Sequence, residues 1–188
     1  MAGGRVPNNF KPRERGQIIM TGPRENVVET DPLENLMREH GLELDWVLHL
    51  ENAAQSIETN GFSVEAFQMI AESARTIGKT IFSHSEREEE YLFPLIENHI
   101  EGPTALMRQE HRKLWEVYGT VMKFVLEVEN GRLCDFSVRG LVQMTKFLAE
   151  YLGGHIQREN TILYRMARRL LTNDEVQQLR TAMVQPSH

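Results

Sequence analysis

Apolar residues recur at helical spacing along most of this chain, in four long stretches separated by short breaks. Positions three or four apart lie on one face of a helix, so each stretch predicts one amphipathic helix. Strand-like alternation is nearly absent after residue 30. The pattern predicts an all-α protein, an antiparallel four-helix bundle. The expected core stripes include Leu33, Met37, His40, Leu44 and Val47; Ile77, Ile81, His84, Glu88 and Leu92; Met107, His111 and Leu114; and Leu152, His155, Glu159, Ile162 and Met166.

Local signals indicate where these helices begin and end. Asp31, followed by Pro32 and by Glu34, is typical of a helix start. Thr172 to Glu175 has the pattern of a capping box, which predicts a short terminal helix. Pro94 is expected to kink the second helix. Further boundaries are expected at Asn60-Gly61, Ser63, Gly102-Pro103, Asn130-Gly131, and Asp135 or Ser137.

Three segments follow from these boundaries. Residues 1–30 contain glycines, prolines and an excess of basic residues without a sustained helical period, which predicts an irregular, partly ordered N-terminal arm. Residues 31–171 form the bundle. Residues 172–188 form the short C-terminal helix and a tail.

Composition narrows the class of protein. A chain of 188 residues suits one domain, and its net charge of −6 argues against a nucleic-acid partner. No apolar run approaches the roughly 18 residues that cross a bilayer, and no secretory signal is evident. We therefore expect a cytoplasmic protein without a membrane partner. Cys134 is the only cysteine, which excludes an internal disulfide and a cysteine-held cluster.

Histidines and glutamates interrupt the apolar stripes in a repeated pattern. Residues 40 and 84 are 44 positions apart, as are residues 111 and 155, and every member of the first set has its match 71 positions later. One such histidine alone would be a hydrogen-bonded core residue, and one His/Glu pair a surface contact. Six residues in register favour a metal site instead. They are His40, His84, Glu88, His111, His155 and Glu159.

Burial of two unpaired carboxylates would cost several kcal/mol, and metal coordination removes that cost. Four imidazole nitrogens and two carboxylates suit two metals, each with two imidazoles, bridged by the two glutamates. Iron is the expected occupant, with manganese and zinc as alternatives. An oxo or hydroxo bridge would raise each metal to five ligands and leave a position open for O₂, NO or peroxide.

The order H…HxxxE…H…HxxxE, with EEEYLFP at residues 88–94, resembles the hemerythrin-like (HHE cation-binding) family of di-iron four-helix bundles. The resemblance covers about residues 32 to 171 and implies that the same six residues are the metal ligands. Oxygen-carrying hemerythrins have a second histidine on the third helix, where Met107 and Trp115 stand here, and an aspartate in place of Glu159. The chain is therefore similar to the four-His/two-Glu subgroup, which includes iron–sulfur cluster repair proteins.

These observations predict a non-haem di-iron protein that binds, or with a separate electron donor reduces, O₂, NO or peroxide in sensing or in oxidative or nitrosative stress. An enzyme of this kind would be a di-iron oxidoreductase. An iron-handling or cluster-repair protein is the alternative, although residues 1–30 lack the cysteine typical of repair proteins. A zinc or manganese hydrolase is a further alternative.

Other polar and aromatic residues lie near the predicted ligands. Glu39 and Glu110 each precede a ligand histidine, and they are candidates to accept an imidazole hydrogen bond or to line a route to the metals. A solvated face is expected for Glu86, Glu89 and Glu90, one of which is also a candidate acceptor. His49, His99 and His188 have no match in the repeat and are expected outside the site. Core packing is expected for Tyr91, Trp115, Tyr118 and Tyr151.

Overall fold

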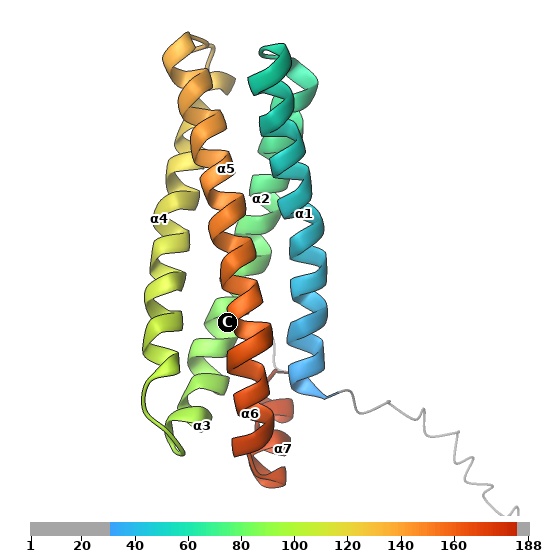
Figure 1. Cartoon of the computed structure of the whole chain (residues 1–188), viewed down its shortest axis with the longest axis vertical. Helices are drawn as coiled ribbons and strands as arrows, with labels where there is room; N and C mark the ends of the chain where they lie inside the picture. The colour runs from blue at the N-terminus through green and yellow to red at the C-terminus, as the bar shows by residue number, and fades with distance from the viewer. Residues whose placement is uncertain (1–30, 184–188) are drawn as a thin grey trace, which may run out of the picture.

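The computed structural model describes residues 31–183, in which four long helices run side by side and short helices close one end (Figure 1). The long helices are α1 (Pro32–Asn60), α2 (Val64–Arg87), α4 (Pro103–Glu129) and α5 (Asp135–Arg158). The short ones are α3 (Phe93–Glu97), α6 (Tyr164–Leu170) and α7 (Asn173–Met183). No strand occurs among residues 31–183, and the all-α prediction is confirmed. The predicted arm and His188 lie outside the described residues.

Hydrogen bonds at the helix starts confirm the local sequence signals. The N–H of Leu33 donates to Asp31 Oδ1 over 2.9 Å, and the N–H of Ala66 donates to Ser63 Oγ over 3.1 Å. Before α7, the N–H of Thr172 donates to Glu175 Oε2 over 2.8 Å. These side chains satisfy amide groups that a helix start leaves without partners.

Two π-helical turns interrupt the α-helical hydrogen bonding at equivalent places. The turn η1 (Glu88–Leu92) joins α2 to α3, and η2 (Glu159–Leu163) joins α5 to α6. In each, an amide donates to the carbonyl five residues earlier: Phe93 to Glu88, and Tyr164 to Glu159. Pro94 follows η1, but Arg165 stands in the same place after η2. Proline is therefore not the cause of the π turns.

The π turn η2 corrects the stripe predicted for the end of the fourth helix. Ile162, expected in the core, is 50% exposed, and Met166 is only half-buried. Leu163, Tyr164 and Ala167 are buried instead. The wider turn contains one extra residue, so the helix face that points inward moves one position along the sequence.

The stripe predicted for α1 was also wrong in part. Met37 and Leu44 are each 37% exposed, whereas Glu43 is 2% exposed. The buried face follows alternating steps of three and four residues, the heptad spacing of packed helices, and Glu43 occupies one of its core positions. This face consists of Leu33, Leu36, His40, Glu43, Val47, Leu50, Ala54 and Ile57.

The core consists of two apolar clusters. The larger fills the bundle between the four long helices, with residues such as Leu50, Ile70, Val121 and Leu148. The smaller packs α3 and α6 under α7, whose Leu179 is fully buried. Along α1, the buried face passes from the smaller cluster to the larger one through His40 and Glu43. A buried polar layer therefore separates the two clusters.

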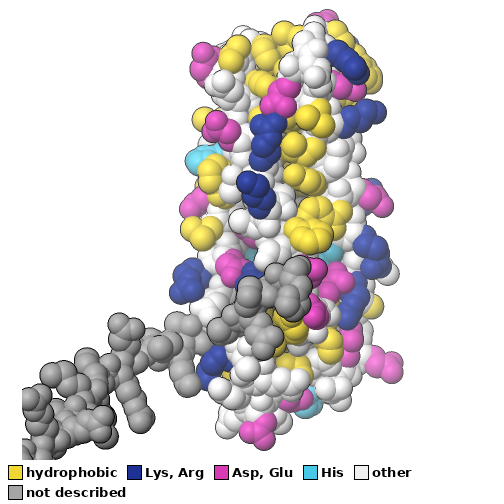
Figure 2. Space-filling model, turned by 180° about the vertical axis from the view of Figure 1, so that it is seen from behind, with side chains coloured by type: hydrophobic (Ala, Val, Ile, Leu, Met, Phe, Trp, Pro, Cys, Tyr) yellow, Lys and Arg dark blue, Asp and Glu magenta, His cyan; other side chains and the backbone are white. Residues whose placement is uncertain are grey.

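Helix packing is uneven around the bundle. Helix α1 packs closely against α2 and α5, and α4 packs closely against α5, whereas α2 and α4 approach each other less closely. On the face turned away from the viewer in Figure 1, hydrophobic side chains form a band along the long axis, flanked by charged side chains (Figure 2). Within residues 31–183, no helix combines the length and apolarity needed to cross a membrane.

Candidate metal centre

The structure brings all six predicted residues together in the polar layer between the two clusters. Each of the four long helices contributes one histidine, and the first residue of each π turn contributes one glutamate. None of the six is more than 3% exposed. They are His40, His84, Glu88, His111, His155 and Glu159.

The imidazole Nε2 atoms all face the two carboxylates. Glu159 Oε2 lies 3.1 Å from His40 Nε2, and Glu159 Oε1 lies 3.1 Å from His155 Nε2. Glu88 Oε1 lies 3.7 Å from His84 Nε2, and Glu88 Oε2 lies 3.4 Å from His111 Nε2. Each carboxylate thus reaches the His40/His84 pair with one oxygen and the His111/His155 pair with the other, and Glu159 Oε1 also lies 3.4 Å from His111 Nε2.

The outward Nδ1 atom of every histidine has an oxygen acceptor. His84 Nδ1 donates to Glu39 over 2.9 Å, and His155 Nδ1 donates to Glu110 over 2.9 Å. His111 Nδ1 donates to Glu89 over 2.7 Å, and His40 Nδ1 donates to the amide oxygen of Asn160 over 2.9 Å. These bonds place the proton of a neutral imidazole on Nδ1 and direct the Nε2 lone pair toward the centre of the cluster.

Two arginines hold the outer glutamates in place. Arg87 donates to Glu39, and Arg158 donates to Glu110 over 2.9 to 3.1 Å. Partial burial raises the pKa of Glu39, but hydrogen bonds from His84 and Arg87 outweigh it and lower that pKa to about 2. Burial likewise raises the pKa of Glu110, but hydrogen bonds from His155 and Arg158 lower it below its ordinary value, so both carboxylates are ionised acceptors for the imidazole N–H groups.

The cluster favours positive charge at its centre. Burial alone would lower the pKa of His84, but the Glu88 and Glu39 carboxylates raise it well above its ordinary value. Burial would raise the pKa of Glu159, but His155 and the other histidines hold it well below its ordinary range. Two ionised carboxylates facing four nitrogens stabilise any cation placed among them.

Tyr164 also reaches the centre, and the sequence analysis missed it. Its hydroxyl donates to Glu88 Oε1 over 2.6 Å and lies 3.1 Å from His84 Nε2. Its ring stacks on His40 with centroids 5.4 Å apart. Tyr164 follows Glu159 by five residues and would point elsewhere in an uninterrupted α-helix, but η2 turns it inward.

Glu43 is a second buried carboxyl that the sequence analysis did not single out. It lies three residues after His40, and its Oε1 has no hydrogen-bond partner within residues 31–183. Burial raises the pKa of Glu43 above its ordinary value. The only guide in the sequence to which residues of the first helix face inward is its apolar stripe. That stripe is equally compatible with Leu44 facing inward.

The remaining predicted neighbours lie further out. Glu86 and Glu90 are exposed, as expected, whereas Glu89 is the acceptor for His111. His49 is exposed, and His99 contacts Glu175 over 2.9 Å at the end of the bundle. Among the aromatic residues considered, Trp115, Tyr118 and Tyr151 pack against the larger core cluster and Tyr91 packs against the smaller one.

The donor set fits two metal ions. The ligand atoms of His40, His84 and Glu159 lie within 4.8 Å of one another, and so do those of His111, His155 and Glu159. Oε2 of Glu88 and Oε2 of Glu159 are buried without a hydrogen-bond donor within the described part of the chain. Donors at right angles around a metal with bonds of about 2.1 Å lie about 3 Å apart, which agrees with the shorter distances above. Imidazole with carboxylate and no thiolate suits iron, manganese or zinc.

Comparison with known proteins agrees with this geometry. The hemerythrin HHE cation-binding domain matches residues 31–167, which include all six residues of the cluster together with Asn160 and Tyr164. No curated protein matches the chain.

Proposed function

Because the chain belongs to the hemerythrin HHE cation-binding family, we propose that it is a non-haem di-iron protein that binds a small ligand of the O₂, NO or peroxide class. One iron would be held by His40 and His84 and the other by His111 and His155. Glu88 and Glu159 would bridge the two. The two sites are the His40/His84 position and the His111/His155 position.

The observation that carries this proposal is the small number of protein ligands available to each metal position. Six side chains shared between two positions supply two imidazoles and two bridging carboxylate oxygens to each. Two irons held in this way would have open coordination positions and would supply electron exchange with a bound ligand. The buried polar layer between two apolar clusters excludes bulk water from these positions, and the imidazole N–H bonds to oxygen acceptors fix the orientation of the ligands.

An apolar cavity beside the centre supports a small, uncharged ligand. It lies between α2 and α4, where these helices pack less closely, with Leu148 of α5 in its wall, and most of its lining side chains are aliphatic or aromatic. Its lining includes Ile81, three residues before His84, and Leu114, three residues after His111. Residues three apart share a helix face, so the cavity is one helical turn from both ligands.

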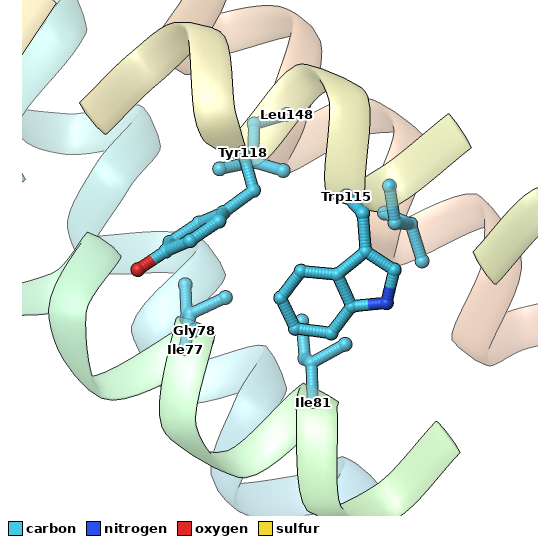
Figure 3. A pocket seen from close by; sticks show the side chains of 7 residues that line it. Ile77, Gly78, Ile81, Trp115, Tyr118 and Leu148 are labelled. Carbon is cyan, nitrogen blue, oxygen red and sulfur yellow. The ribbon is translucent and has the colours of Figure 1, made fainter. Parts of the chain in front are cut away.

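A glycine in the lining of this cavity lets the Tyr118 ring pack directly against α2. Figure 3 shows Trp115 and Tyr118 projecting from α4 toward Ile77, Gly78 and Ile81 of α2. A Cβ atom at position 78 would lie 2.2 Å from the Tyr118 hydroxyl. Only glycine therefore permits the Tyr118 ring to lie where it does.

The test is metal analysis of the full chain grown with iron, combined with absorption spectra during reduction and exposure to air, NO and peroxide. We expect both positions to contain iron, with near-ultraviolet bands that bleach on reduction and change when a ligand binds. Zinc or manganese without a spectral response would contradict the proposal and support a hydrolase. Sustained consumption of NO or peroxide with a supplied reductant would assign an oxidoreductase, whereas a reversible change without turnover would assign a binding or sensing protein.

A further inference from the structure

The Tyr164 hydroxyl lies among the predicted ligand atoms of one metal position. It lies 2.6 Å from Glu88 Oε1, 3.1 Å from His84 Nε2 and 3.5 Å from His40 Nε2. The side chain is 1% exposed. These three neighbours are donors of the His40/His84 position, and their distances from the hydroxyl are close to the roughly 3 Å between neighbouring ligands of one metal.

With the imidazoles neutral, as metal ligands are, hydrogen bonding alone does not account for this arrangement. The phenol has one proton, and the short contact with Glu88 uses it. The Nδ1 protons of His40 and His84 are engaged by Asn160 and Glu39, so both Nε2 atoms present lone pairs to the phenol oxygen. Three lone-pair donors that face one another without a shared proton are satisfied by a cation between them.

The other metal position has no equivalent oxygen. Phe93 stands 71 residues before Tyr164 and follows its own π turn in the same way. Its ring stacks on His111 with centroids 5.7 Å apart, as the Tyr164 ring stacks on His40. Packing on a histidine therefore needs only the aromatic ring. The hydroxyl of Tyr164 is an addition that packing does not explain.

We propose that Tyr164 is a protein ligand of the metal at the His40/His84 position, so that the two metals have different coordination. This inference rests on the proposed di-iron centre. As the metal binds, the phenol O–H bond breaks, its proton passes to bulk water, and the phenolate oxygen donates an electron pair to the metal without any change of oxidation state. The positive charge of the metal stabilises the phenolate, which burial beside Glu88 would otherwise disfavour.

The test compares the ferric wild type with Tyr164→Phe and with the control Tyr151→Phe. Each sample is analysed for iron content, visible absorption and resonance Raman scattering. We expect the wild type and the control to show a phenolate-to-iron(III) charge-transfer band with enhanced phenolate ring modes. Tyr164→Phe should lose the band and keep its iron, because phenylalanine already serves at position 93.

A second variant makes the test independent of how Tyr164→Phe folds. The chain has four tyrosines, so replacing Tyr91, Tyr118 and Tyr151 together by phenylalanine leaves Tyr164 alone. This variant should keep the band. A wild type that holds both irons without the band would overturn the ligand and leave the di-iron centre standing. A wild type without iron would overturn both proposals, and a band that survives Tyr164→Phe would assign the ligand elsewhere.

Discussion

The first half of the bundle, residues 32–97, and the second half, residues 103–170, hold their histidines by the same means. In each, an outer glutamate accepts from the histidine of the second helix and is held by an arginine: Glu39 with Arg87, and Glu110 with Arg158. Each second helix then passes into a π turn that begins with a glutamate of the cluster. The repeated residues are those that orient the cluster.

The halves differ at three places that touch the cluster. Tyr164 stacks on His40 where Phe93 stacks on His111, and Asn160 accepts from His40 where Glu89 accepts from His111. Glu43 is buried beside the His40/His84 position, and its counterpart Leu114 lines the apolar cavity. At these three places the His40/His84 position has a phenol, an amide and a carboxyl beside it, whereas the His111/His155 position has a phenyl ring, a carboxylate and a leucine. A repeated framework therefore carries two different sets of neighbouring groups.

The strongest test of this comparison is to remove one bridging carboxylate. We expect Glu88→Gln and Glu159→Gln each to lose both irons, because each glutamate contacts histidines of both positions. Iron analysis of the purified chains measures the effect, with the exposed Glu150→Gln as a control. Loss of a single iron from either variant would show that the two positions fill independently.

A smaller effect is expected from changing the hydrogen-bond acceptors of His111 and His40, which are a carboxylate and an amide oxygen. Glu89→Gln replaces a carboxylate by an amide and should weaken iron binding at the His111/His155 position by about 10-fold or more, because the carboxylate raises imidazole basicity. Asn160→Asp makes the converse change and should strengthen binding at the His40/His84 position. Titration against a competing chelator measures both. Equal affinities in the two variants and the wild type would mean that these partners only orient the rings.

Glu43→Leu replaces the buried carboxyl of the first half by leucine, the residue at the equivalent position 114 of the second half. We expect it to stabilise the metal-free chain by on the order of 1 kcal/mol, because it removes a buried oxygen without a donor. The pKa of Glu43 is raised above 4.5 in the folded state, so the folded chain binds the proton more tightly and loses stability as the pH rises past 4.5. The gain should therefore be small at acidic pH and larger at neutral pH.

Urea unfolding across this pH range measures the gain, with Glu51→Leu on the exposed face of α1 as the control. A less stable Glu43→Leu chain would show that the carboxyl makes an interaction on which the fold depends.

The smallest effect is expected at the cavity. Gly78 corresponds to Ala149 in the second half, and Gly78→Ala should displace the Tyr118 ring and slow the association of NO with the reduced protein. Stopped-flow absorption measures this rate. Gly119→Ala is the matched control, because a Cβ there meets no atom within 4 Å. Equal rates in the two variants would mean that the ligand enters by another route.

The sequence was sufficient for the fold because its signals are local and agree with one another. Asp31, Ser63 and Thr172 cap the helices that their positions predict. The six polar residues could be selected because they repeat in register on apolar stripes. That they bind metal stays a prediction, although the structure brings them together.

Tyr164 and Glu43 could not be predicted in the same way. Around η2, Ile162, Leu163 and Tyr164 are consecutive apolar or aromatic residues, so the sequence is compatible with either face pointing inward. Packing against α7 and the smaller cluster selects the face with Leu163 and Tyr164. Similarly, Glu43 and Leu44 are adjacent, and the heptad packing of α1 against α2 and α5, which buries the glutamate, is a tertiary effect.

The π turns also set how the chain tolerates changes in length. Deleting one residue from η1 or η2 would restore a continuous α-helix and rotate everything beyond it by about 100° around the helix axis. In η2 this rotation would carry Tyr164 away from His40 and return Ile162 to the interior. Single-residue deletions should therefore be far more damaging here than at the exposed turn near Gly131. Each π turn adds one residue to a turn of α-helix. The added residue allows a glutamate and an aromatic ring five positions apart to face the same site.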